Sequence, residues 1–101
     1  MLASHEPESP AELQAVQINP QEESAWENLG IFYASAGEHA LAIDAEHRAL
    51  QINPEDANAW YVLGATYWMA GQREQALTVY QRLKTLDPVL AQRLFDYIVP
   101  K

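Results

Sequence analysis

A 34-residue period restricts the possible folds of this chain more than any other feature of its sequence. Pro20, Pro54 and Pro88 recur at this interval, and the residues before the first two prolines are nearly the same, AVQINP and ALQINP. Identical residues at the same interval are Trp26 and Trp60, Leu29 and Leu63, Gly30 and Gly64, Tyr33 and Tyr67, Gly37 and Gly71, Ala42 and Ala76, and Arg48 and Arg82. Matches at one fixed period indicate stacked structural repeats, so one unit is expected to occur more than once.

Each unit has the pattern of two helices joined by a tight turn. In residues 57–88, apolar residues return at helical spacing in two halves that Gly71 separates. The first half contains Trp60, Leu63, Gly64 and Tyr67, and the second contains Ala76, Leu77, Tyr80 and Leu83. Gly71 suits the left-handed residue that ends a helix, while Asp87-Pro88 ends the unit and can cap the next helix. Neither helix can bury its apolar stripe alone, so the two are predicted to pack as a hairpin.

Start and stop signals predict six helices along the chain. The first begins at Ser9-Pro10-Ala11-Glu12, with Ser9 as N-cap and Glu12 closing a capping box, and it stops before Pro20. The others are expected from about residue 23 to near 37, from about 39 to 52, in the two halves of residues 57–88, and over residues 89–99 before Pro100.

A helical hairpin repeated every 34 residues resembles the tetratricopeptide repeat (TPR) family. The resemblance implies an all-α fold, a right-handed superhelix of helical hairpins (a TPR solenoid) with about six helices in one domain. Residues 1–22 would form a lead-in and a half-repeat helix, 23–56 the first repeat, 57–90 the second, and 89–101 a C-terminal capping helix. Ile98 stands where a third repeat would have its glycine, so no further helix is expected to pack closely there.

The recurring glycines and tryptophans are interpreted as packing residues. Gly30 and Gly64 lie on the buried stripe, where a missing side chain lets another helix approach closely, and this explains why a helix keeps a residue that costs about 1 kcal/mol relative to alanine. The small residues expected opposite them are Ala42 and Ala76, and the residues expected between successive hairpins are Trp26 and Trp60.

Glu46 departs from the family pattern, because a large aromatic residue is usual at its position and Tyr80 supplies one in the next repeat. We expect Glu46 either to lie at an exposed edge or to face a cation, such as Arg48 or a basic group of a partner.

Composition excludes several classes of protein. The net charge is −8, and residues 1–47 contain nine acids and no Lys or Arg, whereas residues 48–101 contain five acids and six bases. This balance of charges is unsuited to binding the phosphate backbone of a nucleic acid. The excess of acids is interpreted either as a means of keeping the protein soluble or as a charged surface on which a partner docks. With no cysteine, no signal peptide and no apolar run long enough to span a membrane, a cytoplasmic location is expected.

No group of residues predicts an enzyme, a metal site or a cofactor. His39 and His47 lie eight residues apart on one predicted helix without a third ligand at a suitable spacing. Ser35 and His39 lie on opposite sides of the Gly37 turn, and no acid is placed to orient the histidine. No glycine-rich phosphate loop follows a strand.

The resemblance implies a concave groove lined by the first helix of each hairpin, where the family usually binds peptides or helices. The groove positions are Ser24, Glu27, Asn28, Ile31, Ala34 and Ser35 in the first repeat, and Asn58, Tyr61, Val62, Ala65, Trp68 and Met69 in the second. Only Asn28 matches the clamp with which some members hold a peptide carboxylate, since Glu27 and Ile31 replace its Lys and Asn.

Two functions are therefore considered. The first is a scaffold or adaptor that binds an apolar or amphipathic partner segment with some positive charge. The second is a structural unit that forms homo-oligomers by end-to-end stacking or helix exchange, because the first repeat is preceded by a lone helix.

Overall fold

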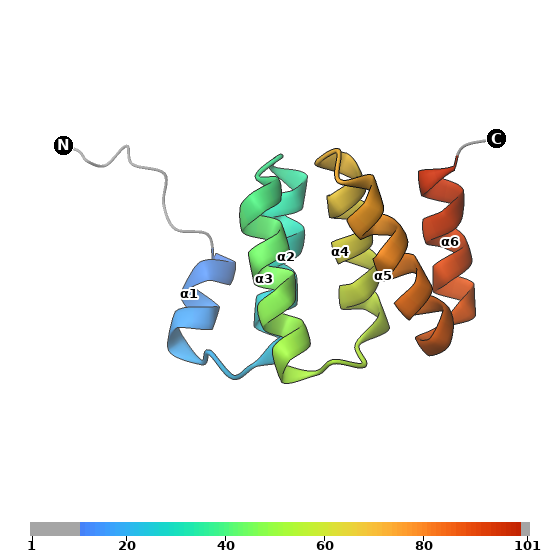
Figure 1. Cartoon of the computed structure of the whole chain (residues 1–101). Coiled ribbons are helices and arrows are strands. Elements are labelled where there is room, and N and C mark those ends of the chain that lie inside the picture. The colour runs from blue at the N-terminus through green and yellow to red at the C-terminus, as the bar shows by residue number, and fades with distance from the viewer. Residues whose placement is uncertain (1–10, 100–101) are drawn as a thin grey trace.

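The computed structural model describes residues 11–99, and the secondary structure of this part consists of six α-helices (Figure 1). They are α1 (Ala11–Ile18), α2 (Glu23–Ser35), α3 (His39–Ile52), α4 (Ala57–Met69), α5 (Arg73–Leu86) and α6 (Pro88–Ile98). The predicted cap at Ser9 and Pro10 and the predicted stop at Pro100 lie outside the described residues. The all-α fold of helical hairpins is confirmed.

Local signals account for most helix ends. Gly37 and Gly71 have φ angles of 80° and 82°, the left-handed conformation that ends a helix at little cost only for glycine. The Asp87 carboxylate accepts a hydrogen bond from the Leu90 backbone N–H at 3.1 Å, and Pro88 occupies the first turn of α6. The predicted cap at Asp87 is therefore confirmed, and α6 begins one residue earlier than expected.

The helices form two layers. The hairpins α2–α3 and α4–α5 follow one another, and α3 and α5 lie in front of α2 and α4 in Figure 1. Within one layer, the backbones of α2 and α4 and those of α4 and α6 come close to each other, whereas no Cα atoms of α3 and α5 lie within 8 Å of each other. The layer of α2, α4 and α6 is therefore more closely spaced, which makes it the inner side of the curved array. We call its solvent-facing surface the inner face.

The core has two parts. The larger includes the fully buried Leu63, Leu83 and Leu94 and extends from the end of α3 to α6. The smaller joins Val16 of α1 to α2 and α3. Trp26 packs against both parts, as expected of a residue between hairpins. The core thus continues along the array, as stacked repeats require.

Trp26 and Trp60 are half-buried, and each is hydrogen-bonded to the loop before its own helix. The indole N–H of Trp26 donates a hydrogen bond to the carbonyl of Pro20, and that of Trp60 donates to the carbonyl of Pro54, both at 2.8 Å. The guanidinium groups of Arg48 and Arg82 lie over the two rings, 5.2 and 5.8 Å from their centroids. These contacts explain why proline, tryptophan and arginine recur together with the period.

The two glycines of the buried stripe permit close packing, but against other residues than predicted. A β-carbon at Gly64 would lie 2.7 Å from a methyl carbon of Leu94 and 3.0 Å from one of Val79. A β-carbon at Gly30 would collide with the Glu46 carboxyl group. The expected partners Ala42 and Ala76 are fully buried but are not the nearest neighbours of these glycines. Close approach is therefore achieved with larger side chains resting on bare backbone.

Candidate functional site

The residues predicted to line a groove belong to α2 and α4, which contact each other in the inner layer. The exposed members are Ser24, Asn28, Ile31, Ser35, Asn58 and Met69, and the half-buried members are Glu27, Ala34, Tyr61, Val62, Ala65 and Trp68. Ile31 and Met69 are 42% and 41% exposed, so apolar surface is open to solvent on both helices. Tyr61, Ala65 and Trp68 also pack against the larger core.

Trp68 lies where three helices meet. The Arg73 guanidinium is 4.8 Å from the centroid of its ring, at the start of α5. The tryptophan, Arg73 and Leu77 line a hollow of about 470 Å³ together with Ile98 and Val99 at the end of α6. Neighbouring helices thus cover part of the ring and leave part of it beside an open hollow.

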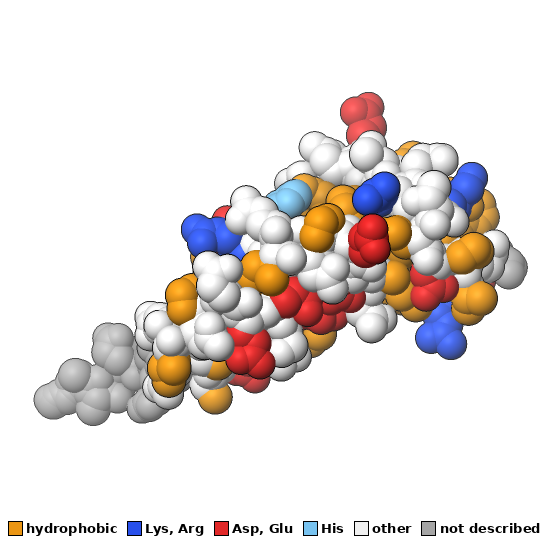
Figure 2. All heavy atoms as spheres, turned by 90° about the horizontal axis from the view of Figure 1, so that it is seen from below, with side chains coloured by type: hydrophobic (Ala, Val, Ile, Leu, Met, Phe, Trp, Pro, Cys, Tyr) orange, Lys and Arg blue, Asp and Glu red, His pale blue; other side chains and the backbone are white. Residues whose placement is uncertain are grey.

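Three acidic side chains meet between the two hairpins, and we call Glu23, Glu27 and Asp56 the acidic cluster. Glu23 and Glu27 are one turn apart on α2, and Asp56 is the N-cap of α4. One carboxylate oxygen from each lies within 4.8 Å of the others, and all three residues are half-buried. Figure 2 shows acidic side chains gathered near the middle of the face seen from below.

Asp56 holds its place in the cluster by capping α4. Its Oδ1 accepts hydrogen bonds from the backbone N–H groups of Asn58 at 3.0 Å and Ala59 at 3.3 Å. Burial opposes ionisation of Asp56, but hydrogen bonds from Glu23 and from the Ala59 N–H outweigh it and lower its pKa. Asp56 is therefore the charged member around which the other two carboxyl groups are arranged.

The two glutamates of the cluster hold protons more tightly than usual. A hydrogen bond with Asp56, together with burial, raises the pKa of Glu23 to about 7. Burial, with the nearby charge of Asp56, raises the pKa of Glu27 to about 7. Near neutral pH, protons therefore partly offset the repulsion within the cluster.

Two of the expectations for Glu46 are wrong, since it lies neither at an exposed edge nor against Arg48, whose guanidinium group lies over Trp26; a basic group of a partner stays a prediction. The residue is 0% exposed, and neither carboxyl oxygen has a hydrogen-bond partner within residues 11–99. Its carboxyl group rests on Gly30, one turn beyond Glu27 on α2. Burial, followed by the charges of Glu27, Asp56 and Glu23, raises its pKa to about 9. Without a cation beside it, Glu46 thus fills, as a neutral acid, the space over the bare backbone of Gly30.

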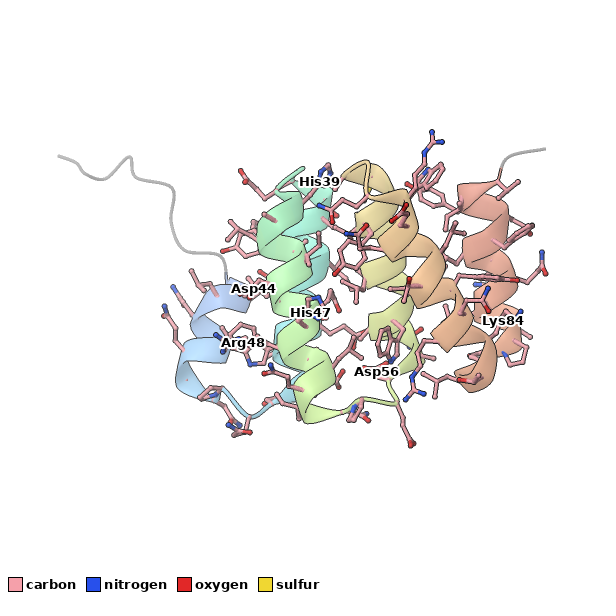
Figure 3. The ribbon with its side chains drawn as sticks, in the orientation of Figure 1. His39, Asp44, His47, Arg48, Asp56 and Lys84 are labelled. Carbon is pink, nitrogen blue, oxygen red and sulfur yellow. The ribbon has the colours of Figure 1, made fainter. Side chains whose placement is uncertain are left out.

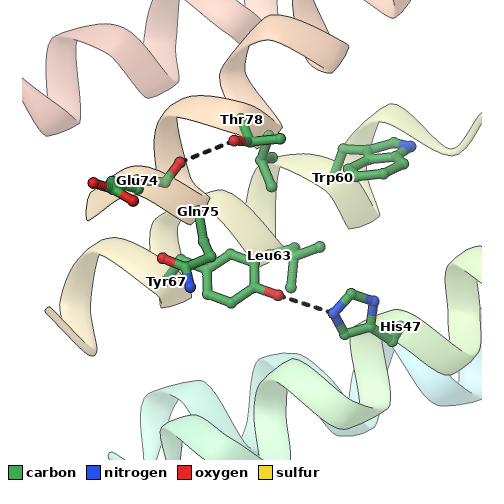
Figure 4. A pocket seen from close by; sticks show the side chains of 8 residues that line it. His47, Trp60, Leu63, Tyr67, Glu74, Gln75 and Thr78 are labelled. Atoms are coloured by element: carbon green, nitrogen blue, oxygen red, sulfur yellow. Dashed lines mark hydrogen bonds between the residues drawn. The ribbon is translucent and has the colours of Figure 1, made fainter. Parts of the chain in front are cut away.

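A separate cavity of about 370 Å³ lies between α3, α4 and α5 (Figure 4). Its lining residues are His47, Trp60, Leu63, Tyr67, Glu74, Gln75, Thr78 and Val79. His47 Nε2 and the Tyr67 hydroxyl are 3.0 Å apart and share a hydrogen bond across this cavity. The Thr78 hydroxyl donates to the Glu74 carbonyl of its own helix, so it is already satisfied.

His39 and His47 do not form a common site. Figure 3 places His39 near one end of α3 and His47 further along it, with Asp56 beyond. Within residues 11–99, the residues close enough to share one ion are the carboxylates of the acidic cluster. The sequence alone does not reveal this cluster, because Asp56 is far from the two glutamates along the chain and the spacing of Glu23 and Glu27 is common on exposed helices.

The comparisons with known proteins agree with the repeat pattern. A family model described as tetratricopeptide repeat matches residues 33–94, which is more than half of the chain. The comparison with curated proteins found no match. Among the described residues, no helix is both long and apolar enough to cross a membrane.

Proposed function

The chain belongs to the tetratricopeptide repeat family, and on this basis we propose that it is an adaptor that binds a peptide or helix of a partner protein on its inner face. Repeats of this family are generally protein-interaction modules and typically not enzymes. The proposal takes residues 23–56 and 57–90 as the two repeats. It takes α6 as a cap, although α6 exposes apolar residues such as Val89 and Tyr97 as well as polar ones such as Arg93.

The apolar surface of α2 and α4 is the observation that carries this proposal. Ile31 and Met69 expose about two fifths of their surface on neighbouring helices, and Trp68 borders an open hollow. Apolar side chains at helical spacing on an exposed face are typical of surfaces that bind extended or helical segments. The flexible Met69 side chain can adapt to different partner residues.

The charge distribution supports a partner segment that carries positive charge. Residues 1–47 contain nine acids and no Lys or Arg, a formal net charge of −9, and they include all of α2. Opposite charge on the partner would speed encounter and suppress binding of acidic segments. We therefore propose a partner segment with apolar residues and some Lys or Arg.

Selection from a displayed peptide library on the immobilised chain tests this proposal. We expect enrichment of peptides that combine apolar and basic residues, and weaker binding of these peptides to Met69→Ser and Ile31→Ser. Leu41→Ser is the matched control, because Leu41 is 48% exposed but belongs to α3 in the other layer. Peptides that bind the inner-face variants as well as the wild type would refute the proposal.

One observation favours the second function, homo-oligomer formation. Within the described residues the backbone of α1 comes close only to that of α2, and Ile18 at the end of α1 is 83% exposed. A second copy could cover this end of the array. Light scattering over a concentration series distinguishes the two functions: a growing mass that Ile18→Ser abolishes supports assembly, and a monomer throughout supports the adaptor.

A further inference from the structure

We propose that the acidic cluster of Glu23, Glu27 and Asp56 is a binding site for a calcium ion, with Glu46 behind it, and that the ion ties α2 to the start of α4. This site goes beyond the proposed adaptor function, because it joins the two hairpins rather than contacting a partner. The cluster meets the first requirement of such a site, since three side chains from two helical hairpins bring oxygen atoms to one point.

The dimensions of the cluster suit calcium. Calcium binds oxygen atoms at about 2.3–2.6 Å, so oxygens around one ion lie up to roughly 5 Å apart. The three carboxylate oxygens lie within 4.8 Å of one another. Magnesium binds at about 2.0–2.1 Å and demands a tighter octahedron, which favours calcium in a site built from three separate carboxylates.

Glu46 provides an independent observation that points to a cation. Its side chain is 0% exposed, and both of its oxygens lack a partner. It rests on Gly30, which follows Glu27 by three residues on α2, so it extends the row of carboxyl groups. A buried atom of Glu23, Oε2, also lacks a hydrogen-bond partner. Buried oxygens are nearly always paired in folded proteins, so two unpaired oxygens of Glu46 beside the acidic cluster and one of Glu23 within it are a place where a cation would find partners.

The basic side chains within residues 11–99 are placed elsewhere. Four of them lie over aromatic rings, Arg48 over Trp26, Arg73 over Trp68, Arg82 over Trp60 and Lys84 over Tyr80. The fifth, Arg93, is exposed on α6. The described part of the chain therefore gives the cluster no cation of its own.

Calcium titration of the whole chain, first stripped with a chelator and dialysed, tests the proposal. We expect isothermal titration calorimetry to show saturable binding of one ion. The CaCl₂ concentration should reach about 10 mM, because weak protein sites have dissociation constants of about 10⁻⁴–10⁻³ M. The melting temperature should rise in parallel, because an ion that binds only the folded state stabilises it. Glu27→Gln should weaken binding at least about tenfold, since even outer-shell changes at metal sites cost about 10–100-fold.

Glu38→Gln is the matched control, because it removes the same charge from an exposed position beside His39, at the far end of α3 from Asp56 (Figure 3). Its calcium affinity should equal that of the wild type. Absence of saturable binding, equal binding by Glu27→Gln, or an equal rise in melting temperature with NaCl of the same ionic strength would each overturn the proposal. Equal affinity for MgCl₂ would overturn the assignment to calcium.

Discussion

Replacing Glu46 with glutamine should stabilise this fold by an amount that depends on pH. The carboxyl group is fully buried without a hydrogen-bond partner in the described residues, and its pKa is raised from 4.5 to about 9. A group whose pKa is higher in the folded state contributes most to stability below its unfolded pKa, and that contribution is lost as the pH rises toward the folded pKa. Glutamine has nearly the same shape and no charge, so it removes this dependence.

The magnitude follows from the two pKa values. At pH 7 the unfolded chain carries an ionised Glu46 and the folded chain a protonated one, and each pH unit between 4.5 and 7 costs 1.36 kcal/mol. Glu46→Gln should therefore add about 3 kcal/mol to the free energy of unfolding at pH 7. For a domain of this size, that corresponds to a rise of more than about 10 °C in melting temperature. Below pH 4.5 the two proteins should have nearly equal stability.

Urea unfolding followed by circular dichroism from pH 4 to pH 9, with a chelator present, measures this difference. Glu38→Gln serves as the control, because the same substitution at an exposed site should change stability little at any pH. If Glu46→Gln and the wild type differ by the same amount at pH 5 and pH 8, the reasoning from buried ionisation is wrong.

Three further predictions concern packing, the tryptophans and charge. Gly64→Leu should lower stability by at least about 1–3 kcal/mol, because even a β-carbon there would lie 2.7 Å from Leu94, and an unchanged melting temperature would contradict it. In urea unfolding, Trp60→Ala should lower the free energy of unfolding by about 3 kcal/mol and Trp68→Ala by about 1 kcal/mol. Trp68→Ala should mainly weaken peptide binding instead, and an equal loss of stability in the two variants would show that both residues are structural. The association rate of a selected basic peptide, measured by stopped flow, should fall between 0.01 and 1 M NaCl, because the Debye length falls from about 30 to about 3 Å. Glu22→Gln should lower this rate at low salt, and an unchanged rate would show that charge steering is absent.

The sequence by itself determined the repeat and the ends of its helices, because these depend on interactions between near neighbours. Residues 39–52 form a helix with the predicted bounds, and the turns at Gly37 and Gly71 take the left-handed conformation that favours glycine. The hydrogen bond from the Trp26 indole to the Pro20 carbonyl is equally local, since it spans six residues, and the same bond recurs one repeat later from Trp60 to Pro54. A repeat of this kind can be found without knowing how its hairpins pack.

Only the tertiary structure decided the environment of Glu46 and the acidic cluster. Glu46 is buried because α3 approaches α2 closely at Gly30, a distance that neither helix sets alone. Glu23 and Asp56 come together because α2 and α4 are neighbours in the inner layer, although they are far apart along the chain. The pKa of a carboxyl group depends on burial and on such distant neighbours. For this reason the same residue type is exposed to solvent at Glu22 and is a buried neutral acid at Glu46.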